Sequence, residues 1–81
     1  MVHVTLTGNL VLVTGGVAKI EVEASNIRQL FKALEAQFPD LEPHLKDGVA
    51  VAVDGQIFQD TWFEPIADGS DVHVLPAIAG G

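Results

Sequence analysis

The residues of this sequence that are best suited to chemistry are its last five, Ala77-Ile78-Ala79-Gly80-Gly81. They carry no charged side chain, so the reactive group that they offer is the α-carboxylate of Gly81. Glycine has no Cβ and accepts most backbone angles, so such an end can thread a narrow channel. A carboxylate is a poor electrophile and must first become a mixed anhydride, such as an acyl-adenylate. We therefore expect an activating partner to act on Gly81, while Gly80 provides clearance.

The rest of the sequence lacks the residue sets that enzymes use. It has no cysteine, which excludes a thiol nucleophile, a disulfide and a cysteine-based metal site. Its histidines, His3, His44 and His73, do not have the spacing of metal ligands, and we expect each to lie at the surface. The sequence contains neither a nucleophile elbow nor a phosphate-binding loop. We predict a chain that is not an enzyme, holds no metal or cofactor, and relies on its partner to bind ATP.

Two stretches near the N-terminus have the alternation of half-buried strands. Residues 2–6 and 18–23 both alternate apolar with polar or charged residues. They predict a hairpin with a long, irregular connection, in which Glu21 and Glu23 lie on one exposed strand face. Residues 9–13 are mostly apolar, and their pattern leaves open whether they extend the first strand or form a turn.

The best-supported helix follows the second strand. Its apolar residues recur at helical spacing on one face: Ile27, Leu30, Phe31, Leu34 and Phe38. Ser25 or Asn26 can serve as the N-cap, but Arg28 stands where a capping box would need Glu, so we expect the box to be incomplete. Pro39 predicts that the helix ends near Phe38.

The second half of the sequence predicts more strands and turns. Residues 40–47 are rich in turn formers, and we expect Leu41 and Leu45 to pack beneath the sheet. Residues 49–53 are apolar at every position, as in an interior strand, and Asp54-Gly55 predicts a tight turn. A short return strand and a final strand are expected at 56–58 and 71–75.

This order of elements predicts an α+β fold. We expect a mixed sheet of four to five strands, with one main helix packed across it and the last strand parallel to the first at the centre. Residues 1–76 would form a single domain, and residues 77–81 a flexible tail. The adjacent Trp62 and Phe63 are the only aromatic pair, and we expect at least one of them in the core.

The charge distribution limits the possible partners. The formal net charge is −7, and no lysine or arginine follows Lys46. The acids of this last part are Asp47, Asp54, Asp60, Glu64, Asp68 and Asp71. Nucleic acids and anionic membranes attract clustered cations, so we expect neither as a partner. The N-terminus lacks the pattern of a signal peptide, so we expect a cytoplasmic protein. The acids serve either solubility or docking on a basic partner surface.

Three stretches resemble the MoaD/ThiS family of ubiquitin-like sulfur carriers. Residues 51–55 are similar to a strand and turn of this family that usually contain the sequence Val-Asn-Gly. Residues 67–76 resemble its Asp-Gly-Asp-x-Val turn and last strand, and residues 77–81 its Val-Ala-Gly-Gly ending. The end of the chain is closer to the molybdopterin synthase small subunit than to the thiamine carriers. Ser70 in place of an acid, and Val11-Leu12-Val13 in place of a more polar segment, depart from that pattern.

The resemblance implies a β-grasp fold and a specific use of the tail. A ubiquitin-activating-like adenylyltransferase would adenylate Gly81 with ATP, and sulfur transfer would then give a thiocarboxylate. A sulfur-accepting enzyme, such as a molybdopterin synthase large subunit, would consume it. In this interpretation Ala77, Ile78 and Ala79 lie extended in a partner groove, and the sheet face near His73 and Asp71 is the docking surface.

Two other functions remain open. A ubiquitin-like protein modifier would use the same activated Gly81 to form isopeptide bonds with lysines. A plain interaction module would not use the Gly-Gly end at all, and deletion of Gly81 would then change nothing. Sequence separates carrier from modifier poorly, because both need the same tail.

Overall fold

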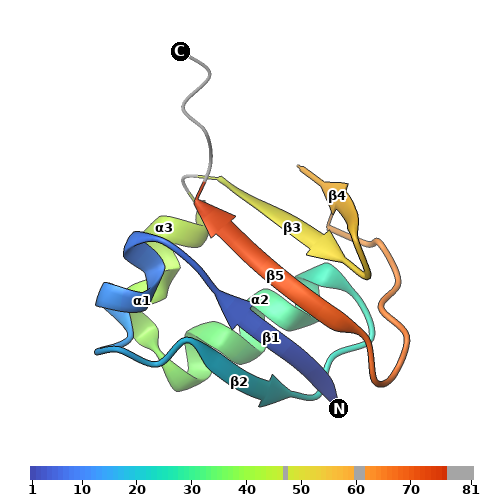
Figure 1. The fold of residues 1–81 in the computed structure, drawn as a ribbon, viewed down its shortest axis with the longest axis horizontal. Helices are drawn as coiled ribbons and strands as arrows, with labels where there is room; N and C mark the ends of the chain where they lie inside the picture. The colour runs from blue at the N-terminus through green and yellow to red at the C-terminus, as the bar shows by residue number, and fades with distance from the viewer. Residues whose placement is uncertain (47, 60–61, 77–81) are drawn as a thin grey trace.

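The computed structural model describes residues 1–46, 48–59 and 62–76, and it confirms the predicted α+β class. A sheet forms one layer and the helices cover one of its faces (Figure 1). Along the chain the elements are β1 (Val2–Leu6), α1 (Asn9–Val13), β2 (Lys19–Val22), α2 (Ile27–Gln37), the 3₁₀ helix η1 (Pro39–Leu41), α3 (Glu42–Lys46), β3 (Val49–Val53), β4 (Gln56–Phe58) and β5 (Asp71–Pro76).

The five strands form one mixed sheet in the order β2-β1-β5-β3-β4. β5 lies at the centre, parallel to β1 and antiparallel to β3, while the two hairpins, β1–β2 and β3–β4, are antiparallel. The expectation that the last strand lies beside the first, in parallel, is therefore confirmed. Because β1 and β5 are parallel, the end of β5 lies at the opposite end of the sheet from Met1 (Figure 1).

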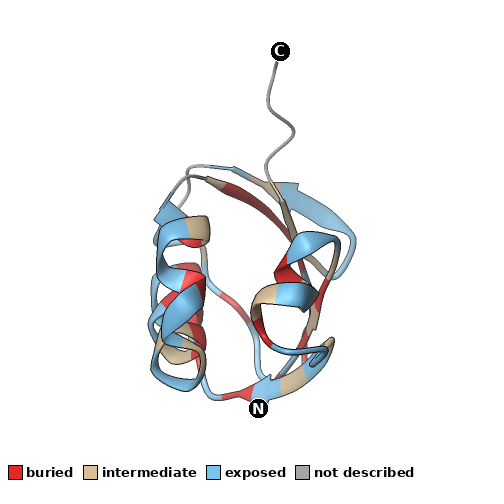
Figure 2. Ribbon diagram, turned by 90° about the vertical axis from the view of Figure 1, so that its left-hand side faces the viewer, coloured by how far each residue is buried: buried red, intermediate tan, exposed pale blue. Residues whose placement is uncertain are grey.

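The core fills the space between α2 and the sheet (Figure 2). The predicted apolar stripe of α2 is buried at Ile27, Leu30, Phe31 and Leu34. It faces the inward residues of the two central strands, among them Val2, Val4, Leu6, Val72 and Val74. The alternation of apolar and polar residues in β1 and β5 thus places one side of each strand in the core and leaves the other side uncovered by helices.

The start of α2 corrects one expectation. Asn26 is the N-cap, and its side chain accepts a hydrogen bond from the backbone N–H of Gln29, 2.8 Å away. The Gln29 side chain in turn accepts from the backbone N–H of Ser25, also at 2.8 Å. Counted from Asn26 rather than Ser25, the third helical position is Gln29, not Arg28. Its side chain bonds the N–H of Ser25 instead of that of the N-cap, so the pair resembles a capping box but does not complete one.

Residues 9–13 form neither a strand extension nor a simple turn, but the short helix α1. Gly8, with φ 62° and ψ −142°, turns the chain out of β1 immediately before it. Leu10 is buried in the core, whereas Leu12 is 80% exposed. Thr14 ends the helix, and its hydroxyl donates to the carbonyls of Val11 and Val17. Burial of Leu10 explains why this apolar stretch coils toward the core.

The connections in the second half agree with the sequence. Asp54 and Gly55 both have positive φ, 49° and 90°, as the tight turn of a β-hairpin requires. The segment expected to be turn-rich contains η1 and α3, and these bury Leu41 and Leu45 as predicted. In the described residues, no helix is long and apolar enough to cross a membrane.

The aromatic pair Trp62 and Phe63 does not supply core residues, so that expectation was wrong. Trp62 is 48% exposed and Phe63 71% exposed. Trp62 rests its ring edge on Phe31, with ring centroids 5.6 Å apart, and its carbonyl accepts from the N–H of Arg28. The buried core consists of aliphatic side chains and Phe31, and neither Trp62 nor Phe63 belongs to it.

Candidate functional site

The five residues predicted to carry the chemistry, Ala77 to Gly81, lie outside the described residues. Their roles stay predictions, and what the structure defines is the base from which this segment continues. That base is the end of β5, at Pro76. Pro76 pairs with Val49 at the start of β3, while Leu75 pairs with Ala50. The chain therefore approaches the segment as a central, doubly paired strand.

Residues that follow β1 fix the end of β5 from its other side. The backbone N–H and the hydroxyl of Thr7 both donate to the carbonyl of Val74, each at 3.2 Å. Gly8 then packs against the ring of Pro76 so closely that a Cβ at Gly8 would lie 2.9 Å from Pro76 Cγ. Only glycine fits this position, because space is lacking and its φ is positive. The end of β5, from which the tail continues, is thus held in place by contacts with the residues that follow β1.

The two predicted docking residues of β5 share the uncovered face of the sheet. Asp71 and His73 alternate with the buried Val72 and Val74, and both are exposed. In register with them on β1 lie His3, opposite Asp71, and Thr5, opposite His73. We call this uncovered side the outer face. It brings His3 and His73 onto neighbouring strands at the surface, as expected, whereas His44 lies apart in α3.

The same register adds apolar residues that sequence reasoning missed. Leu75 follows His73 on the outer face, and its partner on β3 is Ala50. Ala52 pairs with both His73 and Ile57, and Ile57 is 65% exposed. Together Ala52, Ile57 and Leu75 form an apolar strip beside the end of β5, while Ala50 is buried. The signal was present in the sequence, since an interior strand that is apolar at every position must place apolar residues on both faces.

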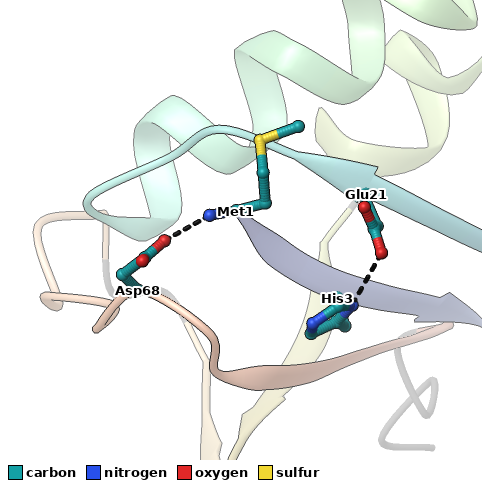
Figure 3. A network of polar contacts seen from close by, with 4 residues as sticks. All are labelled: Met1, His3, Glu21 and Asp68. Atoms are coloured by element: carbon teal, nitrogen blue, oxygen red, sulfur yellow. Dashed lines mark hydrogen bonds and ion pairs between the residues drawn. The ribbon is translucent and has the colours of Figure 1, made fainter.

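Polar groups that can titrate lie at the other end of the outer face, near the N-terminus (Figure 3). His3 Nδ1 lies 3.2 Å from a carboxylate oxygen of Glu21, across the β1–β2 pair. The Met1 amine donates to Asp68. That hydrogen bond raises the pKa of the amine and lowers the pKa of the Asp68 carboxyl. All four groups are at least half exposed, so they form a solvated, polar rim.

A shallow groove of about 520 Å³ runs along β1 and β2 on this rim. The residues lining it include His3, Thr5, Lys19, Glu21 and Asp71. Across the strands Glu21 and Asp71 flank His3, and Lys19 lies opposite Thr5, so the groove is polar, as is the edge of a protein interface. In the described residues, no group of three or more acids or histidines is placed to hold a metal ion. The hydrogen bond to Glu42 raises the pKa of Lys46 on α3, away from this face.

Comparison with known proteins adds the family context. The model of the ThiS family matches residues 4–81, nearly the whole chain. No curated protein matches the sequence significantly.

Solved structures share the fold along the whole chain. A chain from the BexX/CysO complex of Amycolatopsis orientalis is 22% identical with a TM-score of 0.81, and the match covers 100% of both chains. The small archaeal modifier protein 1 of Methanosarcina acetivorans is 17% identical, with a TM-score of 0.79 over 99% of this chain and 95% of that one. A chain from the complex of subunits 1 and 2 of the molybdopterin-converting factor of Helicobacter pylori is 22% identical, with a TM-score of 0.70 over 99% and 97%. At these identities the likeness shows the fold alone, and it confirms the expected β-grasp architecture.

Proposed function

The chain belongs to the ThiS family of small ubiquitin-like sulfur carriers, which are not enzymes, and from this premise we propose that it carries sulfur as a thiocarboxylate on Gly81. The proposal treats residues 1–76 as a single domain and residues 77–81 as its flexible working tail. The observation that supports it most directly is the continuity of β5. One central strand runs from the outer face at Asp71 and His73 to Pro76, where the tail begins.

The proposed chemistry needs two steps at the terminal carboxylate. The Gly81 carboxylate attacks the α-phosphate of ATP on an adenylyltransferase, which releases pyrophosphate and gives the acyl-adenylate. A sulfide-level sulfur donor then attacks the acyl carbon, and AMP leaves with one of the two original carboxylate oxygens. The product is the thiocarboxylate. The adenylyltransferase binds the ATP, so the carrier itself supplies only the carboxylate and the access to it.

The outer face is the proposed docking surface for that enzyme. The apolar strip of Ala52, Ile57 and Leu75 lies beside the base of the tail, and the rim around Asp71 is polar. An apolar centre with a polar rim is the usual anatomy of a protein interface. A partner that covers this strip would receive Ala77, Ile78 and Ala79 directly in its groove, with Gly80 and Gly81 beyond them. His73 lies between the strip and the rim, and we propose it as a contact.

We propose two kinds of partner, both in the cytoplasm. One is a ubiquitin-activating-like adenylyltransferase, and the other is a sulfur-accepting enzyme such as a molybdopterin synthase large subunit. The similar fold in the complex of subunits 1 and 2 of a molybdopterin-converting factor supports the second. The sequence of the tail, Leu75-Pro76-Ala77-Ile78-Ala79-Gly80-Gly81, supports molybdopterin biosynthesis as the pathway.

A second candidate function is protein modification, in which the activated Gly81 is transferred to lysines. The fold shared with the small archaeal modifier protein 1 supports this alternative. The two functions use the same adenylate and differ in the nucleophile that attacks it. Modification predicts adducts on other proteins, whereas sulfur transfer predicts a free thiocarboxylate.

Intact mass spectrometry tests the proposal. The protein is incubated with ATP, a sulfide source and an adenylyltransferase purified from the same cells. A mass shift equal to one oxygen replaced by sulfur at the C-terminus is the expected result. Adducts on lysines of other proteins, without that shift, would favour the modifier. A variant lacking Gly81 is the matched control, and a reaction that proceeds unchanged in this variant would exclude both tail chemistries.

A further inference from the structure

The short helix α1 carries the most exposed of the large apolar side chains that the structure describes. Leu12 is 80% exposed, whereas Leu10, two residues earlier, is buried. Because an α-helix turns by about 100° per residue, Leu12 lies about 200° from Leu10 and faces away from the core. Val11 and Val13 flank Leu12 and pack partly against the core. We call the surface formed by Val11, Leu12 and Val13 the α1 patch.

Contacts outside the helix fix the α1 patch in place. A helix of five residues is too short to be stable by itself, so its position depends on the residues around it. The hydroxyl of Thr14 donates to the carbonyls of Val11 and Val17, at 3.0 and 2.7 Å. The backbone N–H of Gly15 donates to the carbonyl of Leu12 at 3.2 Å. The exposed leucine is therefore presented from a defined turn of the chain.

The α1 patch lies beside the end of β5, where the tail begins. α1 contacts β5, and a Cβ on Gly8, the residue before α1, would lie 2.9 Å from Pro76 Cγ. A helix rises 1.5 Å per residue, so Leu12 is about 6 Å beyond Gly8 and within about 10 Å of Pro76. The apolar strip extends from β5 over β3 and β4, whereas α1 follows β1, on the other side of β5 (Figure 1). The end of β5 thus has an apolar surface on each side.

The length of the tail limits how far an enzyme can stand from this surface. Five residues follow Pro76, and five fully extended residues span at most about 18 Å. An enzyme that acts on the carboxylate of Gly81 must therefore hold its reacting atoms within that distance of Pro76. If the tail enters a channel, as the proposed function requires, the mouth of the channel lies against the surface around Pro76. The α1 patch is part of that surface.

The tail alone gives an enzyme little to recognise, because four of its five residues are alanine or glycine. The enzyme must therefore identify the chain by the surface around the base of the tail. This need is greatest at adenylation, since that step consumes ATP on an unmarked carboxylate, whereas a sulfur-accepting enzyme meets a chain that the sulfur already marks. The α1 patch is also a segment in which the sequence departs from the more polar pattern that it otherwise resembles, which suits a contact that distinguishes this chain.

We propose that Leu12 enters an apolar pocket at the channel mouth of the adenylyltransferase and is a specificity-determining contact for that enzyme. The inference rests on the proposed function and adds a contact on the other side of the tail from the apolar strip. Leu12 acts through binding, so its loss should raise the KM for the carrier and leave kcat unchanged. Because α1 contains no charged residue, the ratio of variant to wild-type KM should be the same at low and high salt.

The exchange of pyrophosphate into ATP, measured at varied carrier concentrations with the adenylyltransferase from the same cells, tests this contact. Leu12→Ser is expected to raise the KM about tenfold or more, because it removes one buried leucine from the complex. Leu12→Met keeps an apolar side chain of similar volume and should stay within about threefold of wild type. Phe63→Ser is the matched control. Phe63 is also exposed, at 71%, and belongs to the segment between β4 and β5, across the molecule from α1 (Figure 1). Its KM should stay within about twofold.

The outcomes separate this inference from the proposed function. Exchange with wild type and an unchanged KM for Leu12→Ser would overturn the inference and leave the proposed function standing. An equal rise for Leu12→Ser and Phe63→Ser, or a fall in kcat without a change in KM, would also overturn it. No exchange with wild type would overturn the proposed function, and this inference with it. Circular dichroism and thermal unfolding establish that each variant is folded.

Discussion

At the scale of single residues, the proposed threading of the tail depends on the absence of a side chain at Gly80. A side chain at this position would add a Cβ and restrict the backbone, and a β-branched one would restrict it most. Gly80→Val is therefore expected to block adenylation of Gly81 while leaving the melting temperature of the protein unchanged. Intact mass after incubation with ATP and the activating enzyme measures adenylation, and thermal unfolding measures the melting temperature. Gly80→Ala should give an intermediate rate. Normal adenylation of the valine variant would contradict the threading of the tail.

The contact between Met1 and Asp68 gives a second prediction at this scale. The carboxylate raises the pKa of the amine, and the amine lowers the pKa of the carboxyl. Asp68→Asn should therefore return the amine pKa toward 8.0, its ordinary value. An NMR titration of the amine measures this, with Asp40→Asn in the 3₁₀ helix η1 as a control.

The same contact has a defined pH window. The raised amine pKa contributes stability that is lost as pH rises through that value, above about pH 8. The lowered Asp68 pKa contributes stability that is lost as pH falls through it, below about pH 4. Wild type and Asp68→Asn should therefore differ in stability between these limits and converge outside them. Since both groups are exposed, the difference is small. A difference that persists at pH 2 would contradict this account.

At the scale of elements, the end of β5 is fixed by the turn at Gly8. Gly8→Ala places a Cβ 2.9 Å from Pro76 Cγ and forces an L residue to φ 62°. We expect a loss of about 1–3 kcal/mol in the free energy of unfolding. We also expect slower adenylation, because Pro76 must shift. Urea unfolding and the adenylation rate measure the two effects.

Gly15→Ala is the matched control for Gly8→Ala. Gly15 also has a positive φ, 74°, but a Cβ there would meet nothing within 4 Å. It should therefore destabilise through strain alone and leave adenylation unchanged. If both variants slowed adenylation equally, the contact between Gly8 and Pro76 would not be what positions the tail.

The capping pair of α2 gives a further prediction for this element. Asn26→Ala removes the acceptor of the Gln29 N–H, and we expect a loss of about 1 kcal/mol in the free energy of unfolding. Asn26→Asp keeps an acceptor at the N-cap and should retain most of the stability. Urea unfolding of the three proteins measures this, and equal stability of the alanine variant would show that the cap contributes nothing.

At the scale of the whole molecule, the net charge gives a prediction about how the chain meets the proposed activating enzyme. A chain of net charge −7 should be steered toward a basic activating enzyme. Its association rate is expected to fall at least tenfold as ionic strength rises from about 0.01 to about 1 M, because the screening length shrinks from about 30 to about 3 Å. Stopped-flow binding measures this. Asp71→Asn should weaken the salt dependence more than Asp40→Asn does, and a rate independent of salt would contradict steering.

Much of the fold followed from local pattern alone. Alternation placed β1, β2 and β5, helical spacing placed α2, and Asp54-Gly55 placed a turn, because period and turn geometry are properties of neighbouring residues. The chemistry of the Gly-Gly end was also read from residue types, since it depends on the absence of side chains. The intact-mass measurement tests whether the tail functions as proposed.

Tertiary structure decided what depends on residues far apart in the sequence. The helix at 9–13 forms because Leu10 has a core to enter, whereas Trp62 packs on Phe31 at the surface and does not join that core. The apolar strip beside the tail needed the register of β3, β4 and β5. The contact of Trp62 with Phe31 needed α2 and the loop after β4 to meet. Burial and proximity arise only when the chain is packed, so a one-dimensional pattern determines elements and reactive groups, while packing determines which surfaces they form.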